Sequence, residues 1–174
     1  MMNYFIQFLT YFRILIAPII FILITLYDSY GWALFLFFLA AISDYLDGFF
    51  ARKYKFESTI GAILDPIADK VLATFLILAL SIELSSVFIG LMGGLILARE
   101  FWVGALRDLN ARTSNDQATQ VTFWAKAKTT IQFFTFSIFL FGLYSDQALL
   151  VFISNFFLFL ALHFLLSNTG LSYT

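Results

Sequence analysis

The stretch ISDYLDGFFARKYKFESTIGAILDPIADK, residues 42–70, places four aspartates between two strongly apolar segments. Asp44 and Asp47 lie near the end of the first segment, and Asp65 and Asp69 lie near the start of the second. Carboxylates are costly at bilayer depth, and those that are kept there usually serve a function. The first question is therefore whether the flanking segments lie in lipid.

The composition of the chain is that of an integral membrane protein. Of its 174 residues, 61% are hydrophobic and 12% are charged, and the mean hydropathy is +0.91. A soluble domain has about 25% charged residues, and each of its helices carries a polar face. The apolar runs here have almost no polar face, which indicates lipid as their solvent. The chain has no cysteine, which excludes disulfides, thiolate metal sites and a cysteine nucleophile.

Six apolar segments, each close to the length of about 20 residues that a spanning helix needs, predict an all-α fold. They cover about residues 6–27, 31–50, 61–82, 86–108, 121–144 and 148–167. Lys and Arg gather in the links after the second and fourth segments, so the positive-inside rule places these links and both termini in the cytoplasm. We expect one polytopic domain, residues 1–174, in the cytoplasmic (inner) membrane. The longest polar stretch, residues 109–120, is expected to be a cytoplasmic loop.

The spacing of the aspartates places each pair on one face of its helix. Asp44 and Asp47 are three residues apart, Asp65 and Asp69 are four apart, and the two segments are antiparallel neighbours joined by a short link. The residues that share these faces are Gly48, Ala51, Arg52 and Gly61. Four carboxylates close together repel one another, and hard oxygen ligands suit Mg²⁺, Mn²⁺ or Ca²⁺. The pattern therefore predicts a metal–carboxylate site for a phosphate-bearing substrate.

These residues resemble the signature of the CDP-alcohol phosphotransferase family, D-x2-D-G-x2-A-R-x8-G-x3-D-x3-D, without departure in residue type or spacing. The stretch FLTYFRILIAP, residues 8–18, resembles the family's N-terminal N-x-L-T-x-x-R, with Gln7 where Asn is usual. The stretches LAREFWVGALR, residues 97–107, and WAKAKTTIQ, residues 124–132, resemble the branch of the family that uses sn-glycerol 3-phosphate as acceptor.

The resemblance implies a six-helix membrane enzyme, often a homodimer, whose active site faces the cytoplasm. It implies transfer of a phosphatidyl group from CDP-diacylglycerol to the hydroxyl of glycerol 3-phosphate, with release of CMP and with Mg²⁺ or Mn²⁺ as cofactor. The other expected partner is membrane lipid, and we expect no nucleic acid.

The resemblance also implies roles for individual residues. Asp44, Asp47 and Asp65 would be metal ligands, and Asp69 would complete the metal site and act as general base on the acceptor hydroxyl. The residues expected to line the cytidine diphosphate pocket are Thr10, Gly48, Ala51, Arg52 and Gly61.

A phosphate monoester as acceptor calls for basic residues beyond the aspartates. Arg99 and Arg107 lie two turns apart on the fourth segment, and Lys126 and Lys128 open the fifth. If that part is helical, the two lysines project to different sides, so one of them is expected to reach the acceptor phosphate.

Simpler interpretations stay open at this point. The four aspartates would then only pair with the basic residues Arg52, Lys53, Lys55 and Lys70. Arg99 and Arg107 would pair with Glu100 or Asp108, or extend to the lipid headgroups. Other functions are the same chemistry with inositol phosphate, phosphatidylglycerol or serine as acceptor, a cation channel or transporter, and a structural membrane protein.

Overall fold

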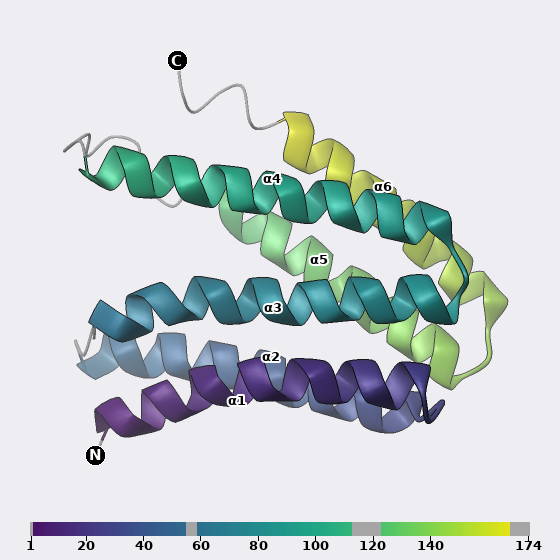
Figure 1. The fold of residues 1–174 in the computed structure, drawn as a ribbon, viewed down its shortest axis with the longest axis horizontal. Coiled ribbons are helices and arrows are strands. Elements are labelled where there is room, and N and C mark those ends of the chain that lie inside the picture. Colours follow the sequence, from purple (N-terminus) through teal and green to yellow (C-terminus); the bar gives the residue numbers. More distant parts are fainter. Residues whose placement is uncertain (1, 55–58, 113–122, 168–174) are drawn as a thin grey trace. The chain divides into compact units, whose positions relative to one another are not determined.

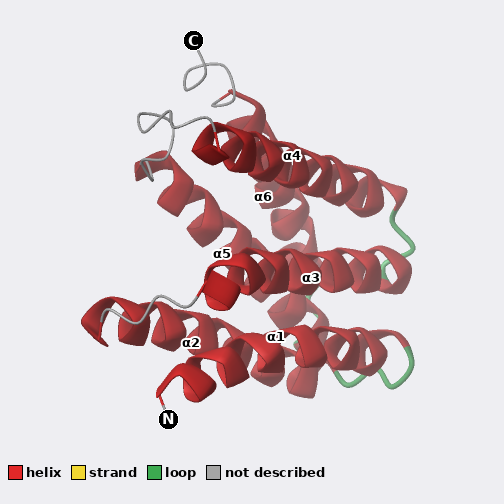
Figure 2. Ribbon diagram, turned by 60° about the vertical axis from the view of Figure 1, so that its left-hand side comes forward, coloured by secondary structure: helices red, strands yellow, loops and turns green. Residues whose placement is uncertain are grey.

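The computed structural model of the chain describes residues 2–54, 59–112 and 123–167 (Figure 1). Side chains are described for residues 8–46, 48–49, 64–106, 109 and 130–163. The described backbone is helical, with short turns and no strand (Figure 2). Its helices are α1 (Met2–Thr25), α2 (Tyr30–Tyr54), α3 (Thr59–Glu83), α4 (Val87–Arg112), α5 (Phe123–Tyr144) and α6 (Ala148–Ser167).

Each predicted apolar segment coincides with one helix, and the all-α prediction is confirmed for the described residues. The helices α2 and α4 continue past their apolar segments into the polar links. Residues 109–112 are therefore helical rather than part of a loop, which corrects the prediction for the start of the stretch 109–120. Hydropathy marks where lipid begins and ends, whereas the backbone hydrogen bonds of a helix continue through polar residues with good helix propensity. Residues 113–122 lie outside the described part of the chain.

Two described helices are long and apolar enough to cross a bilayer, through Phe8–Thr25 in α1 and Val87–Leu106 in α4. Shorter apolar runs of described residues cover Tyr30–Leu46, Thr130–Tyr144 and Ala148–His163. Crossing of the membrane by all six helices, with cytoplasmic termini, remains a prediction.

The chain divides into two compact units, and the first comprises residues 1–86. Within it, α1 packs against both α2 and α3 (Figure 1). Small residues stand where these helices meet: Ala17, Ala33, Ala40, Ala68 and Ala79 are all fully buried. Such residues let helix backbones approach closely, which is how helices gain van der Waals contact where lipid provides no hydrophobic driving force.

The second unit comprises residues 87–174, and there α6 packs against both α4 and α5. The turn from α5 to α6 has Asp146 in the left-handed region, at a φ of 52°. The Gln147 N–H donates to the Gly142 carbonyl at 3.0 Å, and the Asp146 N–H donates to the Leu143 carbonyl at 3.4 Å. This is the pattern of a Schellman motif, which satisfies carbonyls at the end of a helix and turns the chain sharply. The turn from α3 to α4 repeats it, with Ser85 at a φ of 45°.

Gly142 lies where the start of α6 closes onto α5. A Cβ added there would lie 3.1 Å from the Leu150 Cβ and 3.2 Å from the Val151 backbone nitrogen. Neither atom is the end of a flexible side chain, so the helices would have to move apart.

We therefore expect Gly142→Ala to lower the free energy of unfolding by about 1–3 kcal/mol, the usual cost of overpacking. The matched control is Gly94→Ala in α4, where an added Cβ meets no atom within 4 Å. Thermal unfolding of both variants in detergent measures the difference. A Gly142→Ala variant as stable as Gly94→Ala would show that α5 and α6 are not in close contact at this turn.

Candidate active site

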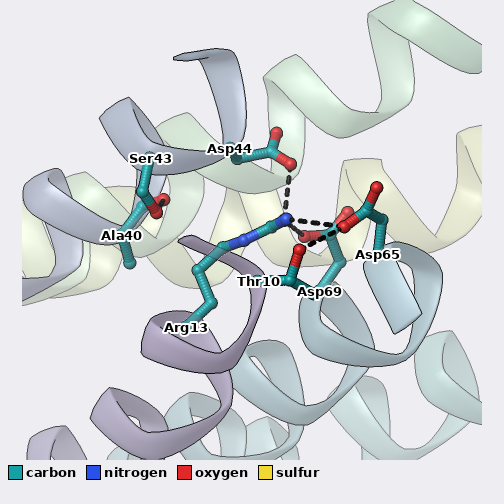
Figure 3. A network of polar contacts seen from close by, with 7 residues as sticks. All are labelled: Thr10, Arg13, Ala40, Ser43, Asp44, Asp65 and Asp69. Atoms are coloured by element: carbon teal, nitrogen blue, oxygen red, sulfur yellow. Dashed lines mark hydrogen bonds and ion pairs between the residues drawn. The ribbon is translucent and has the colours of Figure 1, made fainter. Parts of the chain in front are cut away.

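Arg13 lies at the centre of a polar cluster that joins the three helices of the first unit. The residue comes from the N-terminal half of α1 and is fully buried. Its Nη1 donates to the Oδ1 of Asp44 at 2.5 Å and to the Oδ1 of Asp69 at 2.5 Å (Figure 3). Its Nη2 lies 3.3 Å from the Oδ1 of Asp65. One guanidinium on α1 thus contacts a carboxylate from α2 and two from α3.

Thr10 adds a second contact between α1 and α3. It precedes Arg13 by three residues, so the two side chains leave α1 on the same face. The Thr10 hydroxyl is fully buried and donates to the Oδ1 of Asp65 at 2.7 Å (Figure 3). A hydrogen bond to a charged group is stronger than one between neutral groups, so Thr10 fixes the orientation of Asp65.

The carboxylates differ from Arg13 in their access to the surroundings. The side chains of Asp44, Asp65 and Asp69 are 48%, 38% and 54% exposed, whereas that of Arg13 is 0% exposed. The guanidinium therefore reaches the carboxylates from the protein side and leaves their other side open. Three carboxylates and one guanidinium carry a net formal charge of −2 (three negative charges and one positive).

The donor set fits a divalent cation in its chemistry. Carboxylate oxygens are the ligands that Mg²⁺ and Mn²⁺ prefer, and the residual charge of this cluster favours a cation. Among the described side chains, no three acidic, His or Cys residues have the arrangement of a formed metal site. The Arg13 Nη1 stands between Asp44 and Asp69, at 2.5 Å from the Oδ1 atom of each.

The structure brings together four of the site residues that the sequence predicts: Thr10, Asp44, Asp65 and Asp69. Gly48 lies one turn after Asp44 in α2. The other predicted residues of the metal site and the nucleotide pocket fall in α2 or α3, but their side chains lie outside the described ones: Asp47, Ala51, Arg52 and Gly61.

Of the basic residues expected to bind the acceptor phosphate, Arg99 has a described side chain. It lies in α4, is 15% exposed, and its Nη1 is 3.4 Å from the Oε1 of Glu100. Pairing with Glu100, the alternative that the sequence left open, is thus present, although at a long distance for a charge-assisted hydrogen bond. The side chains of Arg107, Lys126 and Lys128 lie outside the described ones.

Arg13 is the site residue that sequence reasoning missed. The sequence suggested basic residues near the aspartates in the chain as their alternative partners, whereas the described partner comes from α1, 31 to 56 positions away. A signal was present, because Arg13 is a cation within the apolar run Phe8–Thr25. A cation in such a place needs an acidic partner, and the acidic residues at comparable depth were already identified.

Comparison with known proteins identifies the family. The sequence profile described as CDP-alcohol phosphatidyltransferase matches residues 6–166, almost the whole chain. The chain belongs to the CDP-alcohol phosphatidyltransferase family. The match spans both compact units, including the helices that carry Arg13 and the aspartates. Members of this family are phospholipid-synthesis transferases that generally depend on a divalent cation. This chain, with its apolar helices, is a membrane protein.

Several bacterial members of the family are similar over most of their length. The chain is 35% identical over 128 residues to the CDP-diacylglycerol–glycerol-3-phosphate 3-phosphatidyltransferase of Sodalis glossinidius, with 71% of this chain and 69% of that protein covered. It is 34% identical over 128 residues to the enzyme of the same name from Escherichia coli K12, with the same coverage. For the Haemophilus influenzae enzyme, the identity is 34% over 129 residues, with 72% and 69% covered.

We expect Thr10→Val to lower the free energy of unfolding by about 1–3 kcal/mol, because it removes a buried hydrogen bond to a carboxylate and keeps the side-chain shape. Thr135→Val is the matched control, since that hydroxyl is also buried but donates at 2.8 Å to the Ile131 carbonyl of its own helix. Thermal unfolding in detergent measures both. Equal loss in the two variants would contradict a special role of the bond between Thr10 and Asp65.

Proposed function

We propose that this protein transfers the phosphatidyl group of CDP-diacylglycerol to sn-glycerol 3-phosphate, which yields phosphatidylglycerophosphate and CMP. The observation that carries the proposal is the convergence of Asp44, Asp65 and Asp69 from two helices on one point beside α1. The relatives named for this reaction support the choice of substrates.

In the proposed reaction, an oxygen of the acceptor hydroxyl attacks the phosphorus that carries the diacylglycerol. A new P–O bond forms there, the P–O bond to the CMP phosphate breaks, and CMP leaves with the bonding electron pair. The acceptor hydroxyl loses one proton, which an Asp69 carboxylate oxygen accepts. Transfers of this kind depend on positioning and charge neutralisation more than on covalent help from the protein.

The carboxylates supply both the base and the cation ligands in this proposal. Asp44, Asp47 and Asp65 would hold Mg²⁺ or Mn²⁺, together with Asp69. The cation would neutralise charge on the diphosphate and on the leaving CMP. One feature of the structure supports this assignment. Asp65 and Asp69 lie one turn apart on α3 and both contact the Arg13 guanidinium, so their carboxylates point toward the same place. The hydroxyl of Thr10 would hold Asp65 in position.

The nucleotide would lie along the face of α2 and α3 that carries the small residues of the signature. Gly48, Ala51 and Gly61 would let the cytidine diphosphate approach the backbone, and Arg52 would pair with a phosphate. Thr10 would act on this pocket through Asp65, because its hydroxyl donates to that carboxylate.

For the acceptor, we propose a basic pocket made by Arg99, Arg107 and one of Lys126 and Lys128. Arg99 supports it because its side chain is largely buried while its contact with Glu100 is long, at 3.4 Å. A guanidinium with such a weak contact still has N–H groups that can donate to two oxygens of a phosphate.

The proposal includes the arrangement in the membrane. All six helices would cross the cytoplasmic (inner) membrane within one domain, with both termini and the active site on the cytoplasmic side. The protein would act as a homodimer. The basic links after the second and fourth helices support this orientation.

The direct test is CMP release by the purified protein in detergent with CDP-diacylglycerol and Mg²⁺ or Mn²⁺. Glycerol 3-phosphate, inositol phosphate, serine and phosphatidylglycerol are offered in separate reactions. Among these acceptors, we expect only glycerol 3-phosphate to support CMP release, and we expect EDTA to abolish it. In Asp69→Asn, the rate of CMP release should decrease about 10³-fold or more, because a general base contributes about 10²–10⁴-fold and Asp69 would also bind the cation.

Asp28→Asn is the matched control for this substitution. Asp28 is exposed in the turn between α1 and α2, at a φ of 50° that Asn tolerates. We expect its activity to equal that of the wild type. Release with a different acceptor would keep the chemistry and overturn the choice of acceptor. No release with any acceptor would instead favour a cation channel or transporter.

A separate prediction tests the acceptor pocket. Arg99→Ala should raise the KM for glycerol 3-phosphate about tenfold or more, because a charge-assisted pair with the phosphate is lost, which is worth about 1.5–3 kcal/mol. Arg99→Lys should raise it less, since the charge remains while the planar fork is lost. The KM for CDP-diacylglycerol is the internal control. An unchanged KM for glycerol 3-phosphate in Arg99→Ala would remove Arg99 from the pocket.

A further inference from the structure

We propose that Arg13 is a displaceable counter-cation of the aspartate cluster. Its guanidinium neutralises part of the cluster in the metal-free protein, and a divalent cation displaces it from Asp44 and Asp69. This proposal rests on the metal site of the proposed function, but it concerns a residue to which that function assigns no role.

The first support is the position of one nitrogen atom. The Arg13 Nη1 lies 2.5 Å from the Oδ1 of Asp44 and 2.5 Å from the Oδ1 of Asp69. Divalent cations in proteins have oxygen ligands at about 2.0–2.6 Å. A cation that bound these two oxygens together would need the space that the Nη1 fills. The guanidinium and such a cation therefore cannot both make these contacts.

The second support is the charge of the cluster. With Arg13 in place, the four described side chains keep a net formal charge of −2, from three carboxylates and one guanidinium. One positive charge thus limits the repulsion among the carboxylates without removing it. A divalent cation brings twice the charge to the same oxygens, so exchange is electrostatically favoured once the cation has lost part of its water.

The third support is that the two cations would approach from opposite sides. Arg13 reaches the cluster from α1 and is 0% exposed, whereas the carboxylates are 38–54% exposed. A cation from outside can therefore contact the open side of the carboxylates first. In the proposed exchange, the arginine side chain then gives up its contacts with Asp44 and Asp69 by rotation about its own bonds.

Thr10 explains how the cluster would stay in order during the exchange. Its hydroxyl donates to Asp65 at 2.7 Å, and this bond does not involve the guanidinium. Asp65 also has the weakest described contact with Arg13, at 3.3 Å from Nη2. The contacts that break are those to Asp44 and Asp69, while Asp65 keeps its orientation.

The test is the affinity of the purified protein for Mn²⁺ in detergent and without substrate, measured by calorimetry or from the electron paramagnetic resonance signal of free Mn²⁺. The proteins compared are the wild type, Arg13→Gln, Arg13→Lys and the control Asp28→Asn, which changes one charge in the exposed turn between α1 and α2. If Arg13 occupies the cluster about 90% of the time, only about a tenth of the molecules can bind Mn²⁺ at any moment. Removal of Arg13 lets all of them bind it, which raises the apparent affinity for Mn²⁺ about tenfold. We expect a rise in Mn²⁺ affinity of about tenfold or more for Arg13→Gln, and no change for Asp28→Asn.

Arg13→Lys distinguishes displacement of the side chain from an effect of net charge, because lysine carries the same positive charge as arginine. Its single ammonium lacks the planar fork that contacts three carboxylates, so it should compete less well and raise the Mn²⁺ affinity severalfold. Wild-type affinity in Arg13→Lys would overturn the proposal, even if Arg13→Gln bound more tightly. An unchanged or lower affinity in Arg13→Gln would also overturn it and make Arg13 a support of the metal site. Should Arg13→Gln fail to fold, the comparison of Arg13→Lys with the wild type decides.

Thermal unfolding in EDTA and in Mn²⁺ provides a second readout. We expect Mn²⁺ to raise the midpoint of Arg13→Gln by more than that of the wild type, because a cation that binds the folded state more tightly stabilises it more at the same concentration. Equal shifts would contradict the proposal. Wild-type CMP release, measured separately, distinguishes the two proposals: its absence with normal Mn²⁺ binding would overturn the proposed function alone. No Mn²⁺ binding by any of the proteins would overturn the metal site and the displacement together.

Discussion

The contact of the Arg13 guanidinium with three carboxylates ties together the helices of the first unit. A cation within an apolar helix cannot remain without counter-charges, so the position of Arg13 on α1 requires acidic partners on the helices beside it. Asp44 from α2 and Asp65 and Asp69 from α3 meet that requirement at one point. Removing the carboxylates would leave the buried guanidinium uncompensated, which costs more than the pairs themselves contribute. Close packing along α1, through alanines such as Ala17 and Ala40, makes the meeting point possible.

The same carboxylates would serve stability and chemistry. A phosphatidyl transfer site needs several negative groups close together to hold a divalent cation, yet those groups repel one another when no cation is bound. A resident guanidinium solves this conflict, because it lowers the repulsion and still leaves net negative charge for the cation. The partial exposure of the aspartates and the full burial of Arg13 fit these two tasks.

The buried hydroxyls of the second unit are satisfied in a different way. Thr135 and Ser154 donate to carbonyls one turn earlier in their own helices, at 2.8 and 2.7 Å. Such bonds remove the cost of a buried hydroxyl without specifying a neighbouring helix. In the first unit, by contrast, Thr10 and Arg13 bond to other helices and so determine which faces meet. The packing of α6 against α5 depends instead on shape, as the close approach at Gly142 shows.

The amino-acid sequence by itself determined the helices and the family. Hydropathy and helical spacing act over a few turns, so six apolar segments and the aspartate pairs could be located without a partner in view, and the signature of the aspartates indicated the family. The ends of α2 and α4 were predicted less well, because lipid contact ends before the helical hydrogen bonds do. Only the tertiary structure decided that Arg13 contacts Asp44, Asp65 and Asp69, up to 56 positions away. The choice among several possible cations depends on which helix faces pack together, and the spacing of residues along one helix does not specify that packing.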